Sequence, residues 1–188
     1  MKTETPIMKT NLLAKSALAR LMAAENITVE IDAKAPTASF NMEERRLTLP
    51  LWEVEGDSYD MLVGHEVSHA LYTPAGREPL MTAIETVAGG KKNFETAKQY
   101  LNIVEDARIE RLIKVDYPGL RRSFAAGYRE FTARDLFQVK GKEVATMAFI
   151  DRINLQYKIG WLMEVPFSVA ELSLAQRVAT TRTWDEVV

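Results

Sequence analysis

The sequence predicts an α+β fold, in which a small antiparallel sheet comes first and helices form most of the remaining chain. Apolar and polar residues alternate only between about residues 27 and 51, as they do in half-buried strands. From residue 57 onward, the apolar positions recur at helical spacing instead. Of the 188 residues, 47% are hydrophobic and 27% are charged, which is the balance of a folded domain with a sizeable core.

The elements of the N-terminal quarter follow from these two periodicities. An amphipathic helix is expected at residues 10–25, and a strand follows at residues 27–31. Residues 37–41 and 46–51 flank a short charged turn, which predicts a hairpin. Pro50 either limits the second strand of this hairpin or puts it on an edge of the sheet, because proline donates no backbone hydrogen bond.

Helices are expected throughout the rest of the chain. The first begins at Asp57 or Ser58, whose side chains can accept hydrogen bonds from the free N–H groups of a first turn. The expected helices lie at residues 57–72, 78–88, 93–115, 119–136, 141–160 and 168–180. Residues 183–188 resemble the start of a further helix, which indicates either a docked tail or a chain cut from something longer.

Three segments are expected: an N-terminal helix (1–26), a core (27–117) and a C-terminal helical region (118–188). The net charge of −2 offers no broad attraction for nucleic acid or for an anionic membrane. No apolar run reaches the roughly 18–20 residues that span a bilayer. The N-terminus has no signal-peptide pattern. A cytoplasmic location is therefore expected.

The only two histidines, His65 and His69, stand four residues apart in the predicted helix 57–72. Residues at this spacing share a helix face, so both imidazoles can bind one zinc ion. Glu66 is rotated by about 100° around the helix and would stand beside the metal. There it can take a proton from a metal-activated water. Together the three residues form the H-E-x-x-H pattern of metalloproteases.

A helix can carry two such histidines by coincidence, so the surroundings of the motif matter. Its neighbours are apolar, and a partly buried histidine or carboxylate needs polar partners, which a shared ion supplies. The chain has no cysteine, which excludes disulfides and thiolate zinc sites. Because a catalytic zinc ion keeps three protein ligands, the third must be an aspartate or a glutamate.

Glu105, on the predicted helix 93–115, is the expected third ligand. Asn102, Glu105 and Asp106 share one face of that helix, beside an apolar stripe that would pack inward. Asp106 and Asn102 are expected just behind the ligands, with Asp106 orienting a histidine through its other ring nitrogen.

Other carboxylates compete for the ligand role, namely Asp106 itself, Glu110 and Glu85. The simpler alternative is a solvated acidic patch, in which Glu105 and Asp106 pair with Arg108 or Arg111.

The segments H-E-V-S-H-A-L-Y-T-P and N-I-V-E-D-A-R-I-E resemble the gluzincin class of zinc peptidases, in which a glutamate on a later helix completes the site. More narrowly, they resemble the peptidase-like region that precedes a von Willebrand A domain in cobaltochelatase-subunit-type proteins, including bacteriophage-encoded versions. The resemblance covers about residues 27–117 and implies a zincin-like core. It also implies that the edge strand within residues 37–51 holds an extended peptide. In thermolysin-like members, an aspartate behind the ligands follows the ligand glutamate by four positions, where this chain has Ile109.

Two classes of function follow from the resemblance. The first is a zinc metalloendopeptidase that hydrolyses peptide or protein substrates, with Glu66 as general base. The second is a metal-bound accessory or scaffold protein that works with an ATPase or a von Willebrand A-type partner without cutting peptides, and a third option is a phage assembly or processing factor. Glu66 favours catalysis, because a structural zinc site has no use for a general base. The candidates for stabilising the oxyanion are Tyr72, Tyr117, Tyr128, Arg121 and Arg122.

Overall fold

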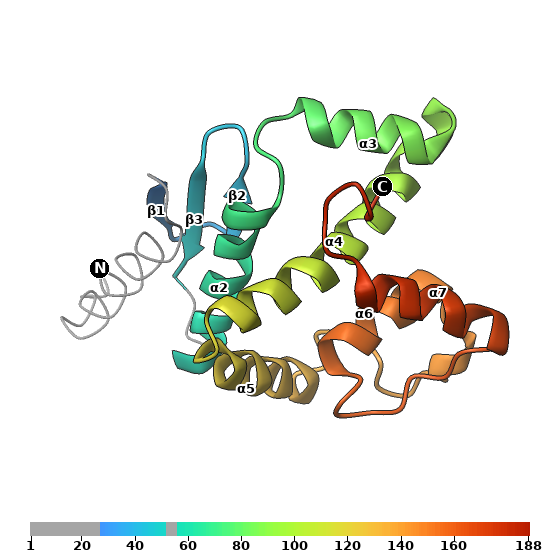
Figure 1. The fold of residues 1–188 in the computed structure, drawn as a ribbon. Coiled ribbons are helices and arrows are strands. Elements are labelled where there is room, and N and C mark those ends of the chain that lie inside the picture. Colours follow the sequence, from blue (N-terminus) through green and yellow to red (C-terminus); the bar gives the residue numbers. More distant parts are fainter. Residues whose placement is uncertain (1–26, 52–55) are drawn as a thin grey trace.

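The computed structural model describes residues 27–51 and 56–188, so the helix expected at residues 10–25 lies outside the described part. A small sheet packs beside one end of a group of helices (Figure 1). The strands are β1 (Thr28–Asp32), β2 (Ser39–Asn41) and β3 (Arg46–Pro50). The α-helices are α2 (Gly56–Tyr72), α3 (Glu78–Ala88), α4 (Phe94–Asp116), α5 (Leu120–Ala133), α6 (Phe149–Ile159) and α7 (Val169–Thr180). The predicted α+β class is confirmed.

The sheet has the order β1-β3-β2, with β3 in the centre. β2 and β3 form the predicted hairpin, but β1 pairs with β3 in parallel, so the sheet is mixed rather than purely antiparallel. Pro50 does end its strand, as predicted, although β3 is not an edge strand. The short β2 pairs only with residues 46–48 of β3, so it leaves the end of β3 that contains Pro50 uncovered on that side.

The main core lies between the sheet and helices α2, α4, α5 and α6. Leu47 and Leu49 of β3 are fully buried there, together with Val67 of α2 and Ile159 of α6. α2 and α5 pack closely because two glycines remove side-chain bulk from their interface. A Cβ atom on Gly64 would lie 3.0 Å from Leu120 Cδ1, and one on Gly127 would lie 2.6 Å from Met61 Sδ. Gly64 directly precedes His65, so this contact fixes the part of α2 that carries the motif.

The predicted helix 141–160 is shorter in the structure. α6 begins only at Phe149, after the short 3-10 helix Val144–Thr146. α5 likewise ends at Ala133 rather than near residue 136. The Asp135 carboxylate accepts hydrogen bonds from the backbone N–H groups of Val139 (2.8 Å) and Lys140 (3.0 Å). Such local bonds compete with helix formation, which explains the longer loop. None of the described helices combines the length and apolar character needed to cross a membrane.

The C-terminal residues fold back onto α4 instead of starting a long helix (Figure 1). Glu186 accepts a hydrogen bond from the Thr183 backbone N–H at 3.2 Å, and the Thr183 hydroxyl accepts one from the Glu186 N–H at 3.3 Å. This reciprocal capping explains why the segment resembles a helix start. Trp184 and Val187 pack on an apolar cluster shared by α3 and α4.

Candidate metal centre

The two histidines of α2 lie next to each other and face α4. Their ring centroids are 5.1 Å apart, and each side chain is 17% exposed, so both rings are largely shielded yet reachable. This arrangement follows from their spacing of four residues on a regular helix.

Asp106 of α4 brings a carboxylate oxygen to both rings. Its Oδ1 atom lies 3.8 Å from His65 Nε2 and 3.4 Å from His69 Nε2. The same oxygen is buried and accepts no hydrogen bond from any of the described residues. Oδ2, the other oxygen, accepts a hydrogen bond from Lys158 Nζ of α6 at 2.9 Å. A buried carboxylate oxygen without a partner is costly unless a ligand completes it.

Glu105, the residue predicted to be the third ligand, is turned away from the Nε2 atoms. Its carboxylate is paired with Arg108, through Nε at 2.7 Å and Nη2 at 2.6 Å, and it accepts the Thr73 hydroxyl at 2.6 Å. One residue along α4 rotates the side-chain direction by about 100°, so Glu105 and Asp106 cannot both point at the histidines. The prediction named Glu105 as the carboxylate beside the histidines. In the structure, Asp106 occupies that position instead.

Groups behind the histidines fix the orientation of both rings. His65 Nδ1 lies 3.0 Å from Glu110 Oε1, a buried carboxylate that also accepts the Tyr128 hydroxyl. His69 Nδ1 lies 3.1 Å from the Thr73 hydroxyl. Because Thr73 donates its own proton to Glu105, its oxygen accepts the Nδ1–H of His69. Each Nδ1 therefore carries the proton of the neutral ring, which leaves the Nε2 lone pairs directed at Asp106.

The charges of the cluster act on one another strongly. Burial alone lowers the pKa of His65, but Asp106, Glu110 and Glu66 outweigh it and raise that pKa to about 9. Burial raises the pKa of Asp106, yet Lys158 and the two histidines hold it well below its usual range. Without a metal, a protonated His65 therefore lies against ionised Asp106, and metal binding has to displace that proton.

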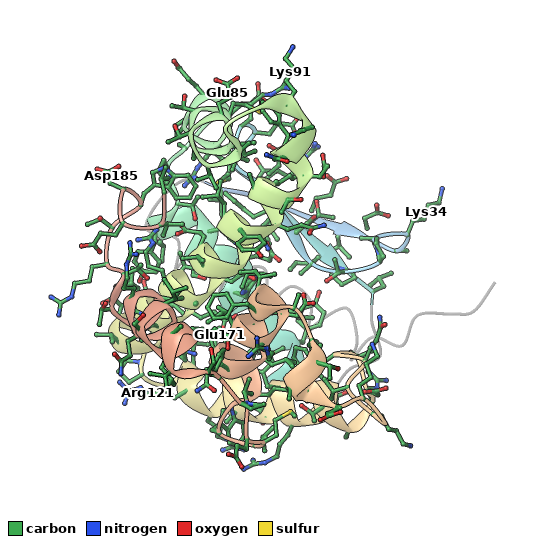
Figure 2. The ribbon with its side chains drawn as sticks, turned by 90° about the vertical axis from the view of Figure 1, so that its right-hand side faces the viewer. Lys34, Glu85, Lys91, Arg121, Glu171 and Asp185 are labelled. Atoms are coloured by element: carbon green, nitrogen blue, oxygen red, sulfur yellow. The ribbon has the colours of Figure 1, made fainter. Side chains whose placement is uncertain are left out.

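The remaining predicted residues are spread over and around the site. Glu66 is half-buried on α2, next to His65. Asn102 is exposed on α4 and lines a hollow beside His69. Glu85 is exposed on α3 and projects outward near Lys91 at one end of the molecule (Figure 2), so α3 does not bring it to the histidines.

The residues predicted as candidates for stabilising the oxyanion lie in different parts of the structure. Tyr128 donates to Glu110 behind His65, and Tyr72 donates to Asp116 at 2.5 Å. Tyr117 is half-buried at the end of α4, and Arg121 and Arg122 are exposed on α5. Figure 2 shows Arg121 at the end of the molecule opposite Glu85. Tyr128 thus contacts Glu110, a group that holds a histidine of the cluster.

The donor atoms fit a zinc ion. One atom from each of His65, His69 and Asp106 can be chosen so that all three lie within 4.8 Å of one another. In tetrahedral zinc sites with bonds of about 2.0–2.1 Å, ligand atoms lie roughly 3.4 Å apart. The separation between His69 Nε2 and Asp106 Oδ1 has this value, and the His65 separation is only slightly wider. Two imidazoles and a carboxylate are also ligands that zinc accepts.

The sequence did not reveal the roles of Thr73 and Lys158. It also placed the ligand carboxylate of α4 at Glu105, one residue before Asp106. One signal was available for the register. Counting from Asp106 instead of Glu105, the position four residues on is Glu110 rather than Ile109. A carboxylate at that position is what holds His65. Lys158 carried no comparable signal, because it comes from α6, far along the chain.

Comparison with models of known families, with curated proteins and with solved structures gave no match. The residues and their geometry are therefore the basis on which a function can be proposed.

Proposed function

We propose that this chain is a zinc-dependent metallopeptidase whose metal ligands are His65, His69 and Asp106. The observation that carries the proposal is the buried Oδ1 of Asp106, which faces both Nε2 atoms and has no hydrogen-bond partner among the described residues. Three donor atoms directed at one point, with their other polar atoms already engaged, are typical of a metal site.

The neighbouring groups of the chain have separate tasks in this proposal. Glu110 and Thr73 hold the two histidines so that their Nε2 atoms remain free for the ion. Lys158 engages Oδ2 of Asp106, which leaves Oδ1 as the single oxygen offered to the metal. Because all three contacts act through a ligand, their loss weakens metal binding without removing a ligand.

A bound zinc ion would supply a Lewis acid that polarises a peptide carbonyl and lowers the pKa of a water molecule. Glu66 stands one residue after His65, half-buried beside the site, where its carboxylate can receive the proton of that water. It can then return the proton to the leaving amine, since the same carboxylate serves as base and then as acid. A site that only held a structural ion would not need this residue.

The test combines metal analysis with a peptide-library cleavage assay on the wild type and Glu66→Gln. We expect both proteins to bind about one zinc ion, and only the wild type to cleave. Zinc in both proteins with cleavage in neither would contradict the peptidase proposal and favour a metal-bound scaffold. Equal cleavage by both would show that Glu66 is not the base.

A further inference from the structure

A small hollow opens directly beside the proposed zinc ligand His69. Its volume is about 80 Å³, and its polar lining comes from His69, Thr73, Lys98, Asn102 and Glu105. Its apolar walls come from separate parts of the fold: Met42 of the β2–β3 turn, Leu80 of α3, Leu101 of α4 and Trp184 of the C-terminal tail. The hollow is therefore built where four segments meet, and His69 is the proposed zinc ligand that lines it.

The C-terminal tail that supplies Trp184 is held in place by hydrogen bonds from two arginines of α4. Arg108 Nη1 donates to the Arg182 carbonyl at 3.0 Å, and Arg111 donates to the Thr181 carbonyl. Trp184 itself is half-buried against the apolar cluster of α3 and α4. A wall fixed in this way can limit what enters the hollow, whereas a loosely attached tail would yield to any ligand.

The same arginine links the tail to the metal centre. Arg108, only 3% exposed, pairs with Glu105, and Glu105 accepts the hydroxyl of Thr73, which holds His69. The wall of the hollow and the orientation of His69 thus depend on one buried cluster. A side chain in the hollow would lie against His69, on the side where Thr73 and Glu105 hold the ring.

The size of the hollow decides which side chains fit. A dry apolar cavity of roughly 150 Å³ is known to accept benzene. At about 80 Å³, this hollow has room for a short aliphatic group but not for an aromatic ring. The walls of methionine, leucine and tryptophan side chains favour an apolar occupant, because burial of apolar surface drives its transfer from water.

We propose that this hollow receives a short aliphatic side chain of the peptide substrate, next to the bond that is cut, and that Trp184 sets its size. The proposal rests on the proposed peptidase function, of which it names the substrate class. Valine-sized residues enter, and phenylalanine is excluded by the indole of Trp184.

The test uses the zinc-loaded chain of residues 1–188 and two peptide hydroxamates that differ in one side chain, valine or phenylalanine. Hydroxamates chelate zinc, so their binding, measured by calorimetry, needs no cleavage. We expect the wild type to prefer the valine compound by at least about tenfold, the scale on which apolar pockets discriminate. Trp184→Ala should reduce this ratio towards one or reverse it, by admitting the larger ring.

Two further variants separate the effect from a loss of folding. Leu80→Phe narrows the hollow from the α3 side and should weaken binding of the valine compound about tenfold. Trp161→Ala removes an exposed tryptophan that lies against Arg129, so it should leave the ratio unchanged. Thermal unfolding of every variant, with and without zinc, identifies any that is not folded.

The outcomes distinguish the two proposals. A wild-type protein that binds zinc and both hydroxamates equally would overturn the role of the hollow and leave the peptidase proposal standing. The same conclusion follows if Trp184→Ala and Leu80→Phe are folded and keep the wild-type ratio. A protein that binds no zinc would overturn both proposals.

Discussion

Two buried charge clusters of this molecule involve α6, and they differ in how completely the protein satisfies them. At the α6–α7 contact, Arg152 donates to the carbonyls of Met147 and Pro166 and to both oxygens of Glu171. At the α4–α6 contact, Lys158 engages only one oxygen of Asp106, and the other oxygen has no partner among the described residues. We call the first cluster closed, because Arg152 and Glu171 satisfy each other and the nearby carbonyls. We call the second cluster open, because Oδ1 of Asp106 faces the two histidines without a hydrogen bond from the described residues.

We interpret this difference as one between a structural cluster and the proposed metal site. A buried charge whose hydrogen bonds are all made needs nothing further from outside the chain. A buried acceptor left unpaired costs about 1–3 kcal/mol, which a native protein tolerates where a ligand completes the site. Changes in the open cluster should therefore alter metal binding, and changes in the closed cluster should alter stability.

The largest expected effect is the loss of zinc from Asp106→Ala. Removing a ligand should weaken zinc affinity by more than about 100-fold, because groups that act only through a ligand contribute about 10–100-fold. Glu105→Ala, the matched change at the neighbouring residue, should weaken it less, since Glu105 reaches His69 through Thr73. Competition with a chelator of known affinity measures both. The reverse order would restore Glu105 as the ligand.

The closed cluster is tested by Arg152→Met. This change leaves Glu171 and two backbone carbonyls without their donor, so we expect the Tm to fall by several degrees. Zinc affinity should stay at the wild-type value, because Arg152 does not contact the histidines or Asp106. Calorimetric unfolding gives the first quantity and chelator competition the second. A large loss of zinc affinity in a folded Arg152→Met protein would contradict the separation of the two clusters.

A smaller effect is expected from Lys158→Met. Without the ammonium group, Oδ2 of Asp106 loses the hydrogen bond from Lys158 Nζ, and Oδ1 is no longer held as the single free oxygen. Zinc affinity should fall about tenfold, and Lys158→Arg should recover part of the loss. The cobalt-substituted protein provides a second readout, since its visible spectrum responds to a change in carboxylate coordination. Unchanged affinity and an unchanged spectrum would mean that Lys158 does not position Asp106.

The smallest expected effect is the pH dependence of the closed cluster. The hydrogen bonds from Arg152, followed by those from Ser168, lower the pKa of Glu171 to about 2 from its ordinary value of 4.5. A carboxyl group with a lowered pKa stabilises the fold fully above its ordinary pKa and loses this contribution as the pH falls through the lowered value. Unfolding of the wild type and Glu171→Gln should therefore differ above about pH 5 and converge towards pH 2. A difference that persisted unchanged at pH 2 would contradict the assigned cause.

Much of the fold could be predicted, because periodicity and capping are local properties of the chain. The predicted helix 78–88 has the same bounds as α3, and the hairpin has its turn at the expected residues. Strand order could not be predicted in this way. Whether β3 lies at an edge or between β1 and β2 depends on long-range pairing, which leaves no distinct pattern in the residues of β3.

The sequence by itself determined that His65 and His69 share a helix face, because a spacing of four residues does so in any regular helix. It also limited the third ligand of the proposed zinc ion to a carboxylate, since the chain has no cysteine and no other histidine. Only the tertiary structure decided that Asp106 faces the histidines and Glu105 does not. That choice depends on how α4 is rotated about its axis. The rotation is set by packing against α2 and α6, and Arg108 of α4 anchors it by donating to the Tyr72 carbonyl at the end of α2.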